Sequence, residues 1–281
     1  MTRASRFFVL AALLVLLSTC AAQAQKGHLL LIGGGERDEP VMRKFVELSG
    51  GGGALILVVP TASEELDTGA RYIAELKGYG CTDVRVLDIV NKEQASHGEW
   101  EKLVPRAGGI FFTGGDQVRI MRACEGTPFA RAVREAYERG AVIGGTSAGT
   151  ACMSTPMITG EGTFTVIRAG ATETTNGLGM LPGIIVDQHF LVRQRENRLI
   201  TVVAEHPDLL GVGVDEATAI WLRPDRSFQV LGEGSVMIFD ARKSKVTKGY
   251  KGTIGLRDLR MHLLLPGDIW HLEEGAPASR E

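Results

Sequence analysis

Short apolar runs rich in β-branched residues alternate with longer amphipathic stretches over the first half of the chain. The short runs predict strands at residues 28–32, 55–59, 84–87, 110–112 and 141–143. The amphipathic stretches predict helices at 41–48, 64–79, 99–106 and 127–139, the last with Thr127 as N-cap and Pro128 at its first position. Strands alternating with helices of this length are typical of an α/β fold, a mostly parallel sheet with helices on both faces.

The pattern changes after about residue 200, where short strands follow one another at hairpin spacing. We expect strands at 211–214, 219–222, 228–231 and 236–239. Neither a linker-like composition nor an internal repeat separates this region from the rest of the chain. We therefore expect a β-rich C-terminal extension of the same sheet, and one domain over residues 26–281.

The N-terminus has the three-part pattern of a secretory signal peptide. Arg3 and Arg6 precede an unbroken apolar run at 7–17, and the small residues of Ala22-Gln23-Ala24 follow. The run is too short to span a bilayer comfortably, and a buried N-terminal helix fits the pattern less well. We expect residues 1–24 to be removed on export to the periplasm or the extracellular space, which leaves no transmembrane span. Cys20 ends a segment that resembles a lipoprotein box, but the bulky residue before it makes lipid anchoring the second choice.

Composition narrows the classes of function. With 44% hydrophobic and 23% charged residues the chain has the balance of a globular protein, and a net charge of -2 argues against a broad nucleic-acid face. Beyond the signal segment three cysteines remain, Cys81, Cys124 and Cys152, so at most one disulfide can form. No Cys/His cluster suggests zinc, and we expect no metal or organic cofactor.

Glycine is enriched, with 36 of 281 residues, and many of these residues stand at the ends of the predicted strands. One such cluster, residues 145–149, matches the G-x-S-x-G pattern directly after the strand at 141–143. A sharp strand-to-helix turn of this kind strains the serine backbone, exposes its hydroxyl and aims the next N–H at a developing oxyanion. A second glycine turn, Gly114-Gly115, favours this interpretation over a purely structural turn. Ser147 is therefore the candidate nucleophile.

A serine nucleophile needs a base and a carboxylate that orients the base. His189, in Asp187-Gln188-His189-Phe190 after an apolar run at 184–186, is the best placed of the histidines. For the carboxylate we favour Glu161, in the loop between serine and histidine, with Glu173 as the competitor.

Three arginines, Arg193, Arg195 and Arg198, closely follow the candidate base. The planar guanidinium matches carboxylates bidentately, so the cluster suggests recognition of an acidic or polar substrate. The alternative is a solvated face balanced by Glu196.

Together these motifs resemble the cyanophycinase and dipeptidase E family of serine peptidases. The resemblance rests on residues 111–117, 144–149 and 187–190, on the three arginines, and on residues 211–216 with the Thr-Ala pair at 218–219. It extends from about residue 28 to about residue 240. It implies a fold like that of the class I glutamine amidotransferases (flavodoxin-like), with serine in place of their elbow cysteine.

The resemblance also implies roles for individual residues. It implies a triad of Ser147, His189 and a glutamate, and an oxyanion hole from backbone N–H groups near Gly115 and at Ala148. Family members often form dimers, so a homodimer is implied as well. The positions that the family uses around its substrate correspond to Gln117, Asp187, Gln188, Arg193, Arg195 and Arg198.

The leading hypothesis is a cyanophycinase-type serine exopeptidase. His189 takes the Ser147 proton, and the alkoxide attacks a β-aspartyl carbonyl. The substrate, a β-aspartyl-arginine polymer or peptide, is thereby cut into dipeptides. One alternative is an aspartyl or isoaspartyl dipeptidase, and another is a secreted, catalytically silent binding protein on the same scaffold. An ordinary α/β-hydrolase esterase fits less well, because its acid and histidine come later in the chain and an HGGG-type motif is absent.

Overall fold

A computed structural model describes residues 27–273 and 276–278 of the chain; the predicted signal segment, Cys20 included, lies outside them. Its centre is a parallel sheet of five strands in the order β1-β5-β4-β2-β3. All residues of β1, β2, β4 and β5 are buried, as expected for strands covered on both faces, whereas β3 at the edge has only Val84 buried. The strands are β1 (Leu29–Ile32), β2 (Leu55–Val59), β3 (Asp83–Val86), β4 (Gly109–Phe112) and β5 (Val142–Thr146).

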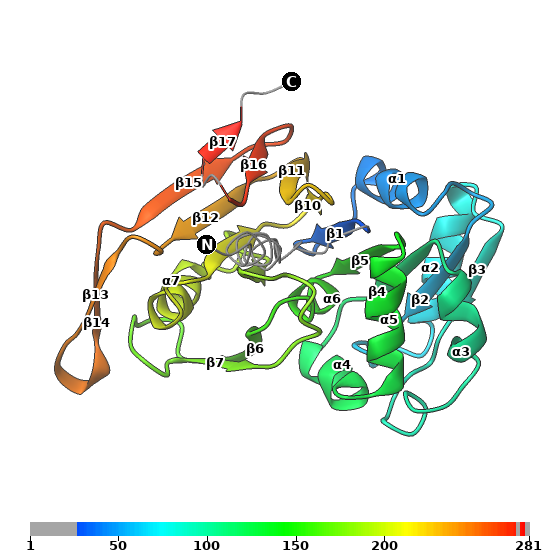
Figure 1. Ribbon diagram of the computed structural model, residues 1–281, viewed down its shortest axis with the longest axis horizontal. Coiled ribbons are helices and arrows are strands. Elements are labelled where there is room, and N and C mark those ends of the chain that lie inside the picture. Colours follow the sequence, from blue (N-terminus) through cyan, green and yellow to red (C-terminus); the bar gives the residue numbers. More distant parts are fainter. Residues whose placement is uncertain (1–26, 274–275, 279–281) are drawn as a thin grey trace, which may run out of the picture.

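Helices cover both faces of this sheet (Figure 1). Neighbouring residues of β4 point to opposite sides, so that Phe111 packs with Phe45 and Tyr72 in one core and Phe112 packs with Phe129 in the other. The first core is closed by α1 (Glu39–Leu48) and α2 (Thr68–Gly78). The second is closed by α3 (Trp100–Leu103) with its following 3-10 turn (Val104–Arg106), α4 (Gln117–Cys124), α5 (Pro128–Glu138) and α6 (Ala148–Ala151).

The predicted α/β fold class is confirmed, and all five predicted strands of the first half are present. Thr127 caps α5 as predicted, because its Oγ1 accepts a hydrogen bond from the Ala130 N–H at 3.4 Å. Two helices without a sequence prediction are α4 and α7 (Glu196–Glu205).

The β-rich C-terminal half is present but is divided between two sheets, which corrects the expectation of a single extended sheet. The strands β10 (Thr218–Leu222) and β11 (Ser227–Gly232) continue the main sheet antiparallel beside β1, followed by β16 (Ile269–His271) and β17 (Ala276–Ala278). A second sheet has the order β15-β12-β9-β8, in which β8 and β9 are parallel neighbours. Its strands are β8 (Ile184–Gln188), β9 (Leu210–Val214), β12 (Val236–Asp240) and β15 (Arg260–Leu264).

A three-residue connector, residues 215–217, takes the chain from β9 in the second sheet to β10 in the main sheet. Ala217, at its end, has a positive φ of 49°, and its N–H donates to the Gly34 carbonyl at 3.1 Å. Because this connector turns away from hairpin geometry, two strands at hairpin spacing in the sequence do not pair with each other.

Two separate hairpins complete the described fold. One joins β6 (Met157–Gly162) to β7 (Thr172–Thr175), and the other joins β13 (Lys245–Lys248) to β14 (Ile254–Arg257) through a 3-10 turn (Tyr250–Gly252). The second hairpin extends from one end of the molecule (Figure 1). The loop after β6 contacts the tip of the β13–β14 hairpin, because the Ala169 N–H donates to the Gly252 carbonyl at 2.9 Å.

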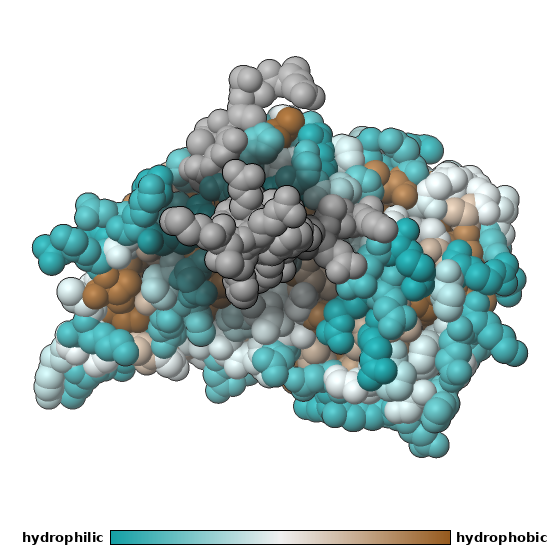
Figure 2. All heavy atoms as spheres, viewed as in Figure 1, coloured by the Kyte–Doolittle hydropathy of each residue, from teal (hydrophilic) through white to brown (hydrophobic). Residues whose placement is uncertain are grey.

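The surface in view is mostly hydrophilic, with small apolar areas between polar ones (Figure 2). Cys81, Cys124 and Cys152 are free and buried. Burial raises the pKa of the Cys124 thiol to about 12, so it remains protonated and unreactive at neutral pH. Within the described residues, none of the helices has the length and apolar character needed to cross a bilayer.

Candidate active site

Ser147 occupies the turn between β5 and α6 with backbone angles φ 52° and ψ -112°. Such a φ is rare for a residue with a side chain and matches the strained serine of a nucleophile elbow. The Ser147 N–H donates to the Ile32 carbonyl at 3.0 Å. Thr150 secures the turn, because its hydroxyl lies 2.7 Å from the Ile32 carbonyl and 2.8 Å from the Gly145 carbonyl.

His189 follows β8 directly and also has a positive φ, 49°. Its Nε2 lies 2.8 Å from the Ser147 Oγ, and its backbone N–H donates to the Gly33 carbonyl at 2.7 Å. The structure therefore brings together the predicted nucleophile and the predicted base.

Glu216 lies on the far side of the imidazole, with its Oε1 2.5 Å from the His189 Nδ1. A carboxylate can only accept, so Nδ1 donates and Nε2 is left to accept the Ser147 hydroxyl proton. This is the hydrogen-bond order of a serine, histidine and acid triad.

The sequence favours Glu161 as the acid, with Glu173 second, and the structure places neither against the histidine. Both side chains are exposed on the β6–β7 hairpin. The reason is topological: β8 and β9 are parallel neighbours, so the residues that follow these two strands face each other. Asp215-Glu216 at the end of an apolar strand was the signal for this acid, since functional residues gather at the carboxyl ends of parallel strands.

The connector between the sheets fixes Glu216 through its neighbours. The Asp215 Oδ1 accepts hydrogen bonds from the Leu191 and Val192 N–H groups, each at 3.2 Å. Residue 215 thus holds the segment after His189, while residue 217 is tied to Gly34, so the acid between them has little freedom.

The electrostatic surroundings keep the imidazole in its basic form. Burial lowers the pKa of His189 below its ordinary value of 6.5, and nearby Arg193 and Arg195 lower it further, although Glu216 acts to raise it. A neutral imidazole at neutral pH can accept the serine proton.

Backbone N–H groups on either side of Ser147 are available for an oxyanion. Ala148 is the first residue of α6, and the first N–H groups of a helix have no partner within the helix. On the other side, Gly115 has φ 138° and passes so close to Ala62 that a Cβ would lie 2.1 Å from its carbonyl oxygen. Gly114 lies between them, its Cβ position 3.5 Å from the Ser147 Cβ.

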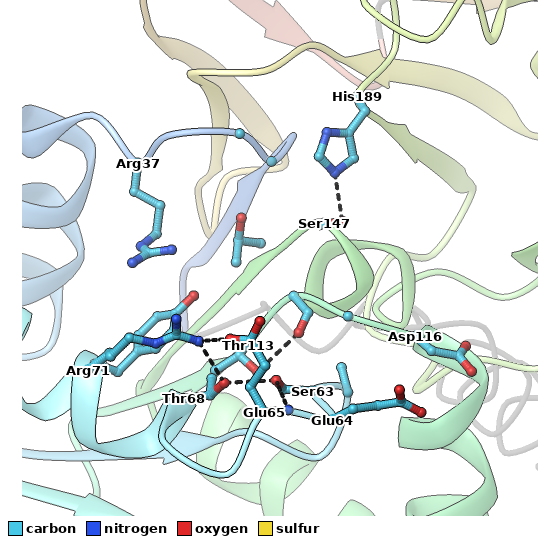
Figure 3. Close-up of a pocket in the computed structure, with 17 residues that line it drawn as sticks. Arg37, Ser63, Glu64, Glu65, Thr68, Arg71, Thr113, Asp116, Ser147 and His189 are labelled. Atoms are coloured by element: carbon cyan, nitrogen blue, oxygen red, sulfur yellow. Dashed lines mark hydrogen bonds and ion pairs between the residues drawn. The ribbon is translucent and has the colours of Figure 1, made fainter.

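A cleft of about 760 Å³ opens beside Ser147 and His189 (Figure 3). It is built from the carboxyl ends of β1, β2, β4 and β5, where α/β sheets usually bind ligands. Its lining is strongly charged, with side chains of both signs: Arg37, Glu64, Glu65, Arg71 and Asp116.

Most of the predicted substrate-contacting residues lie instead in the protein interior beneath His189. Asp187 and Arg198 are almost fully buried and form an ion pair, with Arg198 Nε 2.6 Å from Asp187 Oδ2. Arg195 Nη1 donates to the Gln188 carbonyl at 2.6 Å, and burial lowers the pKa of Arg195 to about 10. This cluster braces the segment that carries the base.

The other predicted contacts are divided. Gln117 is buried, and its Nε2 donates to the carbonyls of Ile158 and Thr159, both at 2.8 Å, which ties α4 to the β6–β7 hairpin. The Gln188 side chain is buried, and its Oε1 makes no hydrogen bond with the described residues. Arg193 alone among the predicted contacts is exposed, beside Phe164 in a separate depression of about 720 Å³.

Within residues 27–273 and 276–278, no group of three or more His, Cys, Asp or Glu side chains is placed to hold a metal ion. The chemistry that the arrangement offers is acyl transfer through Ser147.

Comparison with known proteins decides the family. The sequence model of peptidase family S51 matches residues 29–230. The chain belongs to this family. A cyanophycinase from Nostoc sp. is 38% identical to the S51 peptidase over 238 residues, 83% of this chain and 80% of the relative. A cyanophycinase from Geminocystis herdmanii is 33% identical over 243 residues, 84% of this chain and 89% of the relative.

Solved structures agree on the fold. The crystal structure of a peptidase from an acI-B1 Actinobacterium superposes on the S51 peptidase with a TM-score of 0.68 at 22% sequence identity. The superposition covers 89% of this chain and 98% of the chain in that crystal structure. The S51 peptidase is a serine-type exopeptidase, as the sequence predicts.

Proposed function

We propose that this S51 peptidase hydrolyses β-aspartyl-arginine polymer, or peptides of the same composition, to dipeptides. The observation that carries the proposal is the hydrogen-bonded order Ser147 Oγ, His189 Nε2, His189 Nδ1 and Glu216 Oε1 at the wall of a charged cleft. The substrate is suggested by relatives named cyanophycinase that match the chain over most of its length.

The chemistry is a two-step acyl transfer. His189 Nε2 takes the Ser147 proton as Oγ attacks a substrate carbonyl, and the N–H groups of Gly115 and Ala148 face the oxyanion. The imidazolium, held by Glu216, then protonates the leaving amine, and the acyl-serine ester remains. A water molecule, deprotonated by His189, cleaves this ester and restores the free serine.

The proposed product determines which bond breaks. A dipeptide that retains aspartate joined to arginine through the β-carbonyl is released only when the main-chain amide between aspartates is cut. The attacked carbonyl is therefore the main-chain carbonyl of a β-substituted aspartate, which replaces the β-aspartyl carbonyl of the hypothesis drawn from the sequence.

The test compares Ser147→Ala with the unmodified enzyme on cyanophycin, β-Asp-Arg peptides and α-aspartyl dipeptides, with products identified by mass. The serine variant should lose several orders of magnitude in rate, while Ser244→Ala, on a segment that does not line the cleft, should stay active. Unchanged hydrolysis by Ser147→Ala would exclude this mechanism. Hydrolysis of α-aspartyl dipeptides alone would assign the enzyme to the dipeptidase branch.

We also propose that the enzyme acts outside the cytoplasm, on the basis of the pattern in residues 1–24. Mass measurement of the protein isolated from its native host should show a new N-terminus after Ala24. A mature chain that begins with a lipid-modified Cys20 would show that the protein is exported and anchored by lipid. An intact Met1 would exclude export.

A further inference from the structure

The cleft beside Ser147 has its charges arranged on two sides. Figure 3 shows Arg37 and Arg71 on one side of it, and Glu64 and Asp116 on the other. Its nearest wall carries the nucleophile and the base. A ligand that fits both sides at once needs an anionic group and a cationic group at separate ends.

Arg37 is held as a fixed anion-binding group. Its Nε lies 3.2 Å from Glu75 Oε1 and its Nη2 contacts Glu75 Oε2, while its guanidinium stacks 4.3 Å from the centre of the Tyr72 ring. The side chains of Arg37 and Glu75 are only 26% and 19% exposed. Glu75 and Tyr72 both belong to α2, so one helix sets the position of the guanidinium.

Glu75 occupies only one edge of this guanidinium and does not itself line the cleft. Arginine has five N–H donors in a planar fork, and in the described part of the chain Nη1 makes no hydrogen bond with protein. The side chain points from the segment after β1 into the cleft (Figure 3). The unpaired edge therefore suits a carboxylate from a ligand.

Arg71 is less suited to this task. Its side chain is 56% exposed, contacts Glu65 and lies 3.6 Å from Asp67 Oδ1, so two carboxylates of the protein already face it. On the opposite side, Asp116 accepts the Val118 N–H at 2.7 Å as the N-cap of α4, whereas Glu64 is 83% exposed and lies 2.7 Å from Arg119 Nη1. Asp116 has no ion-pair partner among the described residues, so it is the carboxylate on this side that is free to face a cation.

We propose that this cleft is the subsite for the arginine of the substrate, with Arg37 binding the arginine carboxylate and the Glu64–Asp116 side facing its guanidinium. The inference rests on the proposed function. A β-linked arginine has a free carboxylate at one end and a guanidinium at the other, which matches the two sides. The predicted contacts Asp187, Arg195 and Arg198 are excluded from this task because they pair with one another in the interior.

The experiment uses two synthetic oligomers of β-substituted aspartate, one bearing arginine and the other agmatine, which keeps the guanidinium and lacks the carboxylate. The ratio of kcat/KM for the two is measured with the unmodified enzyme and with Arg37→Gln and Arg43→Gln. Arg43 is the matched control: it pairs with Glu39 on the exposed side of α1 and does not line the cleft.

The unmodified enzyme and Arg43→Gln should prefer the arginine oligomer by about tenfold or more, the effect of one charge-assisted hydrogen-bond pair. In Arg37→Gln the ratio should fall close to one, and in Arg37→Lys, which keeps the charge but not the fork, it should be intermediate. Arg37→Lys also serves if loss of the Glu75 contact prevents Arg37→Gln from folding.

A ratio near one in the unmodified enzyme, or a preference that survives in Arg37→Gln, would overturn the assignment while leaving the peptidase function standing. If the unmodified enzyme cleaved neither oligomer, nor cyanophycin, both the proposed function and the subsite would fail.

Discussion

Ser147 and His189 both adopt backbone conformations that residues with side chains seldom occupy, with φ of 52° and 49°. Each is held there by a hydrogen bond from its N–H to a carbonyl at the end of β1, Ile32 for the serine and Gly33 for the histidine. Strained residues persist only where the surroundings over-determine them, and they cluster at functional sites. A single strand end thus positions both reacting side chains.

The acid of the triad provides the sharpest test at this scale. Glu216→Gln keeps the shape of the side chain but no longer stabilises the imidazolium or selects the tautomer with hydrogen on Nδ1. We expect kcat to fall by roughly 10²–10⁴-fold in a steady-state assay. Glu161→Gln, on the exposed hairpin, is the matched control and should retain nearly the activity of the unmodified enzyme. Loss of activity in Glu161→Gln with retention in Glu216→Gln would identify Glu161 as the acid.

The pH dependence follows from the direction of the His189 shift. Only neutral His189 accepts the serine proton, and burial lowers its pKa below 6.5, so the active form persists into mildly acidic solution. The acid limb of kcat/KM should have its midpoint below pH 6.5. In Glu216→Gln the limb should move to still lower pH, because Glu216 raises the pKa. A midpoint above pH 6.5 in the unmodified enzyme would contradict this environment.

Ser147 and His189 could be predicted from the sequence because each stands directly after an apolar run, within a motif that its chemistry explains. Glu216 could not be identified as the acid from the sequence, because its position beside His189 depends on β8 and β9 being neighbours in the sheet. The arginines show the opposite limit: charge and proximity suggest substrate contact, but Arg198 is 1% exposed and is paired with Asp187. Burial is decided by packing, which residue type alone does not reveal.

At the scale of the elements, the glycine turn after β1 brings backbone against the catalytic base. A Cβ on Gly34, where φ is 111°, would lie 2.2 Å from the His189 Cε1. Gly51, in the loop between α1 and β2, also has a positive φ, 83°, but a Cβ there would meet nothing within 4 Å. The two glycines therefore offer a matched pair of substitutions.

Gly34→Ala should lower kcat by about 10²-fold or more, because displacing the imidazole by about an ångström is enough to lose that factor. Gly51→Ala, which carries the same kind of backbone strain without a contact near the site, should leave activity nearly unchanged. Both proteins are compared by steady-state kinetics and by thermal unfolding, which separates loss of activity from loss of fold. Full activity in Gly34→Ala would mean that the turn does not restrain His189.

The elements of the first half are predictable because a parallel strand covered on both faces is a continuous apolar run, as in β2. The β6–β7 hairpin gave no comparable signal, since most residues of β7 are exposed. The sheet to which each C-terminal strand belongs was also beyond the sequence. For β9 and β10, the sheet changes at the turn that contains Ala217.

At the scale of the whole molecule, the site spans the boundary between two sheets. Ser147 follows a strand of the main sheet, whereas His189 follows a strand of the second sheet. The three tryptophans, at positions 100, 221 and 270, belong to the main sheet and the helix that covers it. Trp270 also contacts the second sheet, because its ring centre lies 4.7 Å from that of His262 on β15, whereas the other two tryptophans monitor the main sheet and its covering helix.

Separation of the sheets should abolish activity before the main sheet unfolds, because local opening needs less free energy than global unfolding. In a urea titration of Trp270→Phe, whose two remaining tryptophans lie in the main sheet and its covering helix, the midpoint for activity should lie below the midpoint for tryptophan fluorescence. Coincident midpoints would show that the two sheets unfold as one unit.

The connector at residues 215–217 has a consequence for how this chain can change over time. Surface loops ordinarily tolerate insertions and deletions. In the connector, each of three consecutive residues has a separate anchor: residue 215 to the segment after the base, residue 216 to the imidazole, and residue 217 to the turn after β1. One added or lost residue would shift all three at once. Here the structure constrains the number of residues as strongly as their identity.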